Sequence, residues 1–309
     1  PKRNLTKNNL PFPYGNNEPK DTVFANVDYS KLTAAVNNAF DSKGQKKKRS
    51  RAVLVIYKDH IIAEKYDTGF TKNSKILGWS MTKSITATLF GILQKQGKYD
   101  INKPAPIPEW QKDERKKITT NDLLHMNSGL EWEEAYDKIC DATKMLFIAE
   151  DMGRVQLEKP AAFAPNTHWN YSSGTSNLLS YILRKQFKTH QEYLDFWYAQ
   201  LIDRIGMHSM LIETDMVGNY VGSSYGWATA RDWAKFGLLY LHKGNWNGDQ
   251  VFDPSWENYV STPTNDSKEG YGAHFWLNAG GHFPAAPRDM YSCNGYQGQK
   301  VFIIPSLDL

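Results

Sequence analysis

The sequence has little cysteine and contains no long hydrophobic run. Only two of its 309 residues are cysteines, Cys140 and Cys293, and their separation excludes the C-x-x-C spacing of zinc and thiol redox motifs. The sequence leaves open whether the two thiols pair, because a disulfide depends on distances within the fold. No apolar run approaches the roughly 18–20 residues that a membrane-spanning helix needs. We therefore expect no integral membrane segment.

The sequence also has no strong excess of positive or negative charge, since its formal net charge is +4. The one dense basic run, Lys46 to Arg49 followed by Arg51, is predicted to be a solvated loop, because no aromatic or basic repeat supports a nucleic-acid-binding surface. The eight histidines lack H-E-x-x-H spacing and close acidic partners. We expect no nucleic-acid partner, no metal and no cofactor.

The chain starts without a signal-like segment, because Pro1 to Asn4 lead into no apolar core. An export signal would have to precede residue 1. The residues themselves give neither the compartment nor the oligomeric state. The composition, 40% hydrophobic and 23% charged, is typical of an ordinary soluble globular protein.

Hydrophobic spacing predicts strands near both ends of the chain and helices between them. The predicted strands are residues 52–57, 61–66, 271–278, 290–294 and 301–304. The predicted helices are residues 28–41, 80–96, 119–126, 177–184, 191–205 and 228–241. This order favours an α/β (α+β) fold in which an antiparallel sheet, formed by both chain ends and flanked by helices, carries a mainly helical insertion. We expect a sheet subdomain from residues 1–75 and 210–309, a helical subdomain from residues 76–209, and an active site between them.

The last residues form a strand and a turn without a return strand. Val301 to Ile304 is strand-like and Pro305 to Asp308 is turn-like, but Leu309 stops where a second arm would begin. Because folds usually avoid an open sheet edge, we expect the natural chain to continue past Leu309.

The candidate nucleophile is Ser80, in the motif S-x-x-K with Lys83. Residues three apart share one face of a helix, so the hydroxyl and the amine can meet. A lysine whose ammonium form is destabilised by burial can accept the proton of a serine near neutral pH. The simpler interpretation of an isolated S-x-x-K is a helix start with a capping serine and a solvated lysine.

Two further segments carry candidate site residues. Tyr171 lies in Trp169-Asn170-Tyr171-Ser172-Ser173-Gly174, and a tyrosine beside a Ser–Lys pair can act as a phenolate or a proton relay. Its alternative is a half-buried tyrosine with a satisfied hydroxyl. The run from Cys293 to Gln299 is rich in glycine, which lets a strand approach a ligand and present N–H groups. A β-bulge or a tight turn is an equally good interpretation of that run.

A rival nucleophile is Ser224, because Gly222 to Gly226 fits the G-x-S-x-G elbow of α/β-hydrolases. An elbow needs a buried strand before it and a helix directly after it. The preceding segment, residues 216–221, is broken by Gly218 and Asn219, and the chain lacks repeated βα units. We therefore expect Ser224 to line the cleft or shape a turn.

Taken together, the motifs resemble those of the serine β-lactamase-like superfamily on its class C side, and within it the branch of 6-aminohexanoate-dimer hydrolases and class C-like esterases. The resemblance runs from about Ala52 to Leu309. It rests on residues 79–84 (WSMTKS), 122–130 (DLLHMNSGL), 171–174 (YSSG), 222–232 (GSSYGWATARD) and 295–299 (GYQGQ). The resemblance implies Ser80 as nucleophile, with Lys83 and Tyr171 sharing the acid and base duties. It also implies export to the periplasm, with a cytoplasmic location left open.

Two departures from that family bear on the substrate. Ser173 stands where a Y-x-N asparagine is usual, and Tyr296-Gln297-Gly298 replaces a K-T-G or H-x-G strand without the lysine that helps hold a β-lactam carboxylate. These departures favour hydrolysis of small-molecule esters or small amides over β-lactams and peptidoglycan. A true β-lactamase or D,D-peptidase, and a catalytically inactive binding module, remain the alternatives.

The expected site includes aromatic residues as well as backbone groups. We expect the oxyanion between the N–H of Ser80 and an N–H of the Tyr296–Gly298 strand. The candidate substrate contacts are Tyr296, Gln297, Gly298, Ser173, Trp79, Trp132, Tyr136 and Ser224. Trp169 is a further cleft candidate because it lies close to Tyr171. His125 is expected to have a packing role.

Overall fold

The computed structural model describes residues 1–42 and 47–309. The first half of the chain contains α1 (Tyr29–Asn38), β1 (Ala52–Tyr57), β2 (His60–Tyr66), β3 (Ile76–Leu77), the 3₁₀ turn η1 (Trp79–Met81), α2 (Thr82–Lys95), η2 (Pro108–Lys112), η3 (Glu114–Lys117), α3 (Thr120–Leu124), α4 (Asp141–Phe147) and α5 (Met152–Leu157). The second half contains α6 (Ser173–Arg184), α7 (His190–Trp197), η4 (Tyr198–Ile202), β4 (Leu211–Ile212), β5 (Gly226–Ala228), α8 (Ala230–Leu241), β6 (Asn245–Trp246), β7 (Asp249–Gln250), α9 (Ser255–Ser261), β8 (Trp276–Leu277), β9 (Tyr291–Gly295), η5 (Tyr296–Gly298), β10 (Gln299–Ile303) and η6 (Pro305–Leu307).

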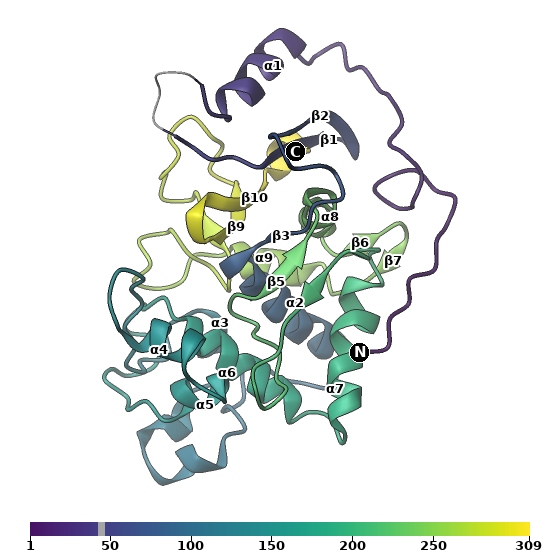
Figure 1. The fold of residues 1–309 in the computed structure, drawn as a ribbon. Coiled ribbons are helices and arrows are strands. Elements are labelled where there is room, and N and C mark those ends of the chain that lie inside the picture. The colour runs from purple at the N-terminus through teal and green to yellow at the C-terminus, as the bar shows by residue number, and fades with distance from the viewer. Residues whose placement is uncertain (43–46) are drawn as a thin grey trace.

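The strands of the two chain ends lie in one part of the molecule, and the helices α3 to α6 lie in another (Figure 1). β1 and β2 form an antiparallel hairpin, and β10, β9 and β8 form an antiparallel sheet in that order. Both sheets contact helix α8. The expected α/β fold with antiparallel strands from both ends is therefore confirmed, with the detail that the described strands form separate sheets joined through α8.

Helix α2 is the centre of the core, because every residue from Thr82 to Leu93 is buried. Such burial requires partners for its polar side chains. Ser84 Oγ donates to the carbonyl of His274 at 2.7 Å, Thr86 Oγ1 donates to the carbonyl of Gly222 at 2.9 Å, and Thr88 Oγ1 lies 2.7 Å from the hydroxyl of Tyr240. These bonds fix the rotation of the helix that carries Lys83.

Several predicted boundaries differ from the structure. The expected strand at 271–278 is reduced to Trp276–Leu277, and the expected helix at 191–205 ends at Trp197, where the π-helical turn η4 follows. The short helices α4, α5 and α9 were not predicted. Of the two interpretations that the sequence allowed for residues 296–298, the tight turn is correct and the strand is wrong. These residues form the turn between β9 and β10, with Gln297 at φ 60°.

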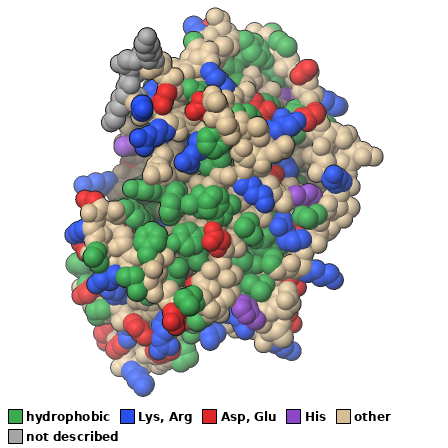
Figure 2. Space-filling view, viewed as in Figure 1, with side chains coloured by type: hydrophobic (Ala, Val, Ile, Leu, Met, Phe, Trp, Pro, Cys, Tyr) green, Lys and Arg blue, Asp and Glu red, His purple; other side chains and the backbone are tan. Residues whose placement is uncertain are grey.

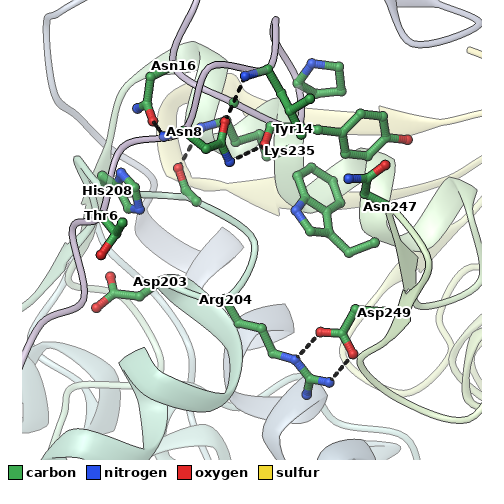
Figure 3. A pocket seen from close by; sticks show the side chains of 15 residues that line it. Thr6, Asn8, Tyr14, Asn16, Asp203, Arg204, His208, Lys235, Asn247 and Asp249 are labelled. Atoms are coloured by element: carbon green, nitrogen blue, oxygen red, sulfur yellow. Dashed lines mark hydrogen bonds and ion pairs between the residues drawn. The ribbon is translucent and has the colours of Figure 1, made fainter.

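Residues 1–20 cross the surface as an extended arm. The guanidinium of Arg3 binds the carboxylate of Asp203 at 2.7 Å and lies 4.2 Å from the centre of the Tyr198 ring. Further along, the arm borders a pocket of about 280 Å³, in which Asn8 donates to the carbonyl of Tyr14 (Figure 3). The arm is thus held by specific contacts with the body of the protein.

Other sequence expectations concern charge, thiols and membranes. Residues 47–49 of the basic run are exposed, as expected for a solvated loop, and Lys46 lies outside the described residues. Both Cys140 and Cys293 are buried free thiols. Within residues 1–42 and 47–309, no helix combines the length and the hydrophobicity required to cross a membrane.

Candidate active site

The turn that carries Ser80 is held in an unusual backbone conformation. Trp79, directly before it, has φ 48°, in the left-handed region that a tryptophan rarely adopts. Glycine is required at position 78, because a Cβ atom there would stand 2.3 Å from the Trp233 ring. Thr82 Oγ1 donates to the carbonyl of Trp79 at 2.8 Å and accepts from the N–H of Gly226 at 3.0 Å. These contacts place Ser80 at the start of α2 and connect its turn to β5.

Lys83 lies one helical turn after Ser80 and is 1% exposed. Its Nζ lies 3.1 Å from Ser80 Oγ, 2.8 Å from Ser173 Oγ and 2.9 Å from the carbonyl oxygen of Ser223. Burial disfavours the ammonium form and lowers the pKa of Lys83 to about 8, although the nearby charge of Glu134 opposes this change. A large share of Lys83 is therefore the free amine at slightly alkaline pH.

Tyr171 lies beside Lys83, two residues before the start of helix α6. The Lys83 Nζ lies 5.1 Å from the centre of its ring, and the ring packs against Trp276 and Tyr271 at 5.3 and 5.8 Å between centroids. Burial, followed by the charges of Tyr271 and Glu134, raises the pKa of Tyr171 well above its ordinary value, while a hydrogen bond with Ser80 acts in the opposite direction. The phenol therefore stays protonated at neutral pH.

The expected aromatic residues Trp79, Tyr136 and Tyr296 lie around Ser80, Lys83 and Tyr171. Trp79 meets Tyr296 and Tyr225 edge-on, with centroids 5.9 and 6.2 Å apart, and Tyr136 lies 5.0 Å from Tyr296. Tyr136 and Tyr296 are 38% and 45% exposed, so they form the outer rim of the site. Figure 2 shows hydrophobic side chains gathered across the centre of the same face, between the β9–β10 hairpin and helices α4 to α6.

Four other predicted site residues lie away from the outer rim, either buried or in the exposed hairpin turn. Trp132 is buried, and its indole N–H donates to Glu134 Oε2 at 2.5 Å. Gln297 and Gly298 are exposed in the turn η5. Ser224 is 1% exposed, and its hydroxyl lies 2.9 Å from that of Ser223.

The geometry around Ser224 does not match a nucleophile elbow. The strand β5 follows Ser224 rather than preceding it, and helix α8 starts only at Ala230. The buried hydroxyl is satisfied by its neighbour instead of being presented at the end of a strand. Ser224 shapes a turn, which agrees with the sequence-based expectation for this residue.

His125 has the expected packing role. Its Nδ1 lies 2.5 Å from Thr264 Oγ1, and burial lowers its pKa to about 4. Within residues 1–42 and 47–309, no group of three His, Cys, Asp or Glu side chains is arranged to hold a metal ion.

The sequence reasoning missed Glu134. Its carboxylate accepts from the N–H of Ser173 at 2.8 Å and from Ser173 Oγ at 2.5 Å, and it also bonds the hydroxyl of Tyr136. A signal was present, because Trp132 and Tyr136 were both candidates and Glu134 lies midway between them in the sequence. The site therefore contains a carboxylate beside the Ser80–Lys83 pair.

Comparison with known proteins decides the family. The sequence profile of the Beta-lactamase family matches residues 36–309. The chain belongs to the Beta-lactamase family. A search among curated proteins gave no match.

Solved structures agree with this family assignment. A Bacillus anthracis structure provisionally named 6-aminohexanoate-dimer hydrolase is 20% identical, with a TM-score of 0.73, over 90% of this chain and 74% of that chain. A penicillin-binding protein homologue from Caulobacter crescentus is 14% identical, with a TM-score of 0.68, over 94% and 92%. A family VIII carboxylesterase is 15% identical, with a TM-score of 0.66, over 94% and 91%. At these identities the likeness shows the fold, and the Beta-lactamase-family protein has the fold of a family of hydrolases.

Proposed function

We propose that this Beta-lactamase-family protein is a serine hydrolase that cleaves carboxylic esters or small amides through an acyl-enzyme on Ser80. The observation that carries this proposal is the 3.1 Å distance between Ser80 Oγ and the Nζ of Lys83, a fully buried amine with a pKa lowered to about 8. A buried amine at this distance from a hydroxyl is the arrangement that activates a serine.

In the first step, Ser80 Oγ bonds to the substrate carbonyl carbon while Lys83 Nζ takes the hydroxyl proton. The carbonyl oxygen then carries the negative charge of a tetrahedral intermediate. As this intermediate collapses, the bond to the alcohol or amine breaks and the leaving group needs a proton. The raised pKa of Tyr171 keeps its phenol protonated, so the phenol can relay a proton to the leaving group while the Lys83 ammonium restores the phenol proton.

Water completes the reaction, with Lys83 again as the base. A water molecule loses a proton to Lys83 as its oxygen bonds to the acyl carbon, and Ser80 Oγ leaves with a proton returned from the ammonium. The protonation states therefore favour Lys83 as the base and Tyr171 as the acid. This narrows the earlier expectation, in which the two residues shared both duties.

The oxyanion would be bound by backbone N–H groups from two elements. Ser80 lies at the N-terminal end of α2, where N–H groups point outward and favour negative charge. Turn η1 contacts both β9 and β10, so the hairpin turn at Tyr296–Gly298 is near enough to be the source of a second N–H. Each such donor is worth about 10²–10³-fold in rate.

The proposed substrate class follows from two residues that replace a lysine and an asparagine of related enzymes. Tyr296 stands at the rim in place of a lysine, and Ser173 in place of an asparagine. A substrate carboxylate would gain no charged partner from either residue, so the favoured substrates are esters and small amides whose binding does not depend on such a partner.

The test is a parallel rate comparison on a short-chain aryl ester, a linear aminohexanoate dimer and a chromogenic cephalosporin. We expect the ester or the amide to be hydrolysed, and Ser80→Ala to lower kcat by at least about 10³-fold. Ser224→Ala is the matched control and should retain hydrolysis. Preferential cephalosporin hydrolysis would favour a true β-lactamase instead.

Covalent labelling separates an enzyme from an inactive binding module. A fluorophosphonate should add to Ser80 in a one-to-one ratio, as detected by intact mass and peptide mapping. If neither this reagent nor a reactive β-lactam forms an adduct with the folded protein, the hydrolase proposal is wrong and a binding module is the better description.

A further inference from the structure

The Glu134 carboxylate is surrounded by hydrogen-bond donors. It accepts from Trp132 Nε1, from the N–H and the Oγ of Ser173, and from the hydroxyl of Tyr136. Ser173 is the first residue of helix α6, so the carboxylate lies at a helix N-terminus, where negative charge is stabilised. These contacts fix both oxygen atoms of Glu134.

The hydroxyl of Ser173 connects Glu134 with Lys83. Its oxygen lies 2.5 Å from Glu134 Oε1 and 2.8 Å from Lys83 Nζ, and the side chain is fully buried. A serine hydroxyl has one proton, and a carboxylate can only accept. The proton of Ser173 is therefore directed to Glu134, and the oxygen of Ser173 must accept from Lys83.

This arrangement determines which way the free amine of Lys83 can face. Of its three neighbours, the carbonyl of Ser223 can only accept, and Ser173 has committed its proton to Glu134. The two N–H groups of the amine are thus assigned to these acceptors. Ser80, at 3.1 Å, is the one remaining neighbour of the three that can donate to the electron pair of the nitrogen.

We propose that Glu134 is a positioning residue which, through Ser173, turns the electron pair of the Lys83 amine toward the Ser80 hydroxyl. This inference rests on the proposed function, because it concerns the step in which Ser80 loses its proton. Glu134 itself touches neither the substrate carbonyl nor Ser80 in this scheme. Without its carboxylate, the hydroxyl of Ser173 is free to rotate and donate to Lys83, in competition with Ser80.

The charges around Lys83 give this inference a signature in the pH dependence. The titratable groups that face Lys83 are Glu134, Tyr171 and His274. Burial lowers the pKa of His274 to about 3, and the pKa of Tyr171 is raised, so both are neutral at pH 7. The charge of Glu134 raises the pKa of Lys83 against the effect of burial. Removing that charge should shift the titration of Lys83 to lower pH.

The test measures the rate of Ser80 labelling by a neutral fluorophosphonate between pH 6 and 10. Glu134→Gln should lower the plateau rate about 10- to 100-fold, as expected when a general base is misdirected, and should move the midpoint to lower pH. Glu133→Gln is the matched control, because the neighbouring Glu133 side chain is an exposed partner of Lys138. It should keep the plateau and the midpoint of the unmodified protein.

A double-variant cycle gives a second measurement. Ser173→Ala removes the connecting hydroxyl but keeps the bonds from Glu134 to Trp132, Tyr136 and the N–H of Ser173. It should lower the plateau to a similar extent, and the Glu134→Gln/Ser173→Ala protein should be no slower than the slower single variant, because both act along one route. If thermal unfolding shows that Glu134→Gln does not fold, the plateau labelling rate of Ser173→Ala alone tests the positioning role of Glu134.

The outcomes distinguish this inference from the proposed function. If the unmodified protein is not labelled at Ser80, the proposed function is wrong. If the unmodified protein is labelled, and Glu134→Gln has the same plateau and midpoint as Glu133→Gln, the hydrolase survives and the positioning role of Glu134 is overturned. If the rate losses of the two single variants add in the double variant, the inference that Glu134 acts through Ser173 is likewise overturned.

Discussion

Gly295 lies directly against the backbone carbonyl of Gly78, where a Cβ atom on residue 295 would stand 2.0 Å from the oxygen. A real Cβ cannot approach a backbone oxygen so closely, and a carbonyl cannot rotate away as a flexible side chain can. The end of β9 therefore passes as close as possible to the turn that carries Ser80. Only glycine can occupy position 295 at this distance from the carbonyl of Gly78.

Gly295→Ala should consequently separate the β9–β10 hairpin from the nucleophile turn. We expect a loss of about 1–3 kcal/mol in the free energy of unfolding, as for other overpacked sites, together with a fall in ester hydrolysis larger than the fraction of unfolded protein explains. Denaturant unfolding and kcat/KM on the same samples measure both. Gly69→Ala, at an exposed glycine with no neighbour within 4 Å, should lower stability without changing kcat/KM; equal activity losses in both variants would contradict the interpretation.

Tyr296→Lys tests the proposed reason for substrate preference. The side chain is half-exposed at the rim, so a lysine can be accommodated with its ammonium in contact with water. We expect the ratio of kcat/KM for a carboxylate-bearing cephalosporin to that for a neutral aryl ester to rise about 10-fold, equivalent to one charge-assisted hydrogen bond. Tyr296→Met, which removes the ring without adding charge, should leave that ratio unchanged.

Burial of Lys83 should make stability depend on pH. The pKa of Lys83 falls from 10.5 to about 8 on folding, so between these values the unfolded chain binds more protons and stability rises with pH. The free energy of unfolding of the unmodified protein, relative to that of Lys83→Met, should be constant below pH 8 and increase by about 3 kcal/mol toward pH 10.5. Urea unfolding at several pH values measures the difference; a flat difference would mean that the amine stays charged in the fold.

Arg231 should stabilise the fold through a half-buried carboxylate. Its guanidinium binds both oxygens of Glu64 at 2.8 and 2.7 Å, and, although burial raises the pKa of Glu64, these bonds lower it overall. Arg231→Met should cost about 1–3 kcal/mol at pH 7 because Glu64 would lose its partner. A lowered carboxylate pKa gives stability that is lost as pH falls, so the cost should shrink toward pH 3.

The matched control for this ion pair is Arg204→Met. Arg204 binds Asp249, which is 54% exposed, at 2.6 Å, and exposed pairs contribute less than about 1 kcal/mol. Chemical unfolding at pH 3, 5 and 7 compares the two variants. Equal costs at pH 7 would show that the partial burial of Glu64 has no energetic effect.

The sequence predicted most accurately those features that depend on short chain separations. Ser80 and Lys83 meet because they lie three positions apart, within one helical turn, and helix α2 was recognisable from its apolar stripe. The β1–β2 hairpin was similarly visible, since its strands flank a short polar turn. Tyr171 was placed beside them only through the resemblance to a known family.

The features that were missed depend on contacts between distant segments. Glu134 lies in a loop without periodicity, and its role becomes visible only when helix α6 brings Ser173 against it. Helix α4 has Ala142, Met145 and Leu146 on its buried side, but seven residues are too few for that spacing to stand out. For residues 296–298, glycine was compatible with a strand or a turn, and the pairing of Gly295 with Gln299 determines the turn.

The contact between Arg3 and Asp203 has a consequence for the order in which the chain folds. The two residues are 200 positions apart, so a ribosome must add about 200 residues to the chain before the arm can find its binding place. During that interval the arm is exposed polypeptide, open to proteases and to other proteins. Docking of the arm would then follow the folding of the segment that carries Asp203, and resistance of residues 1–20 to proteolysis would report that this segment is in place.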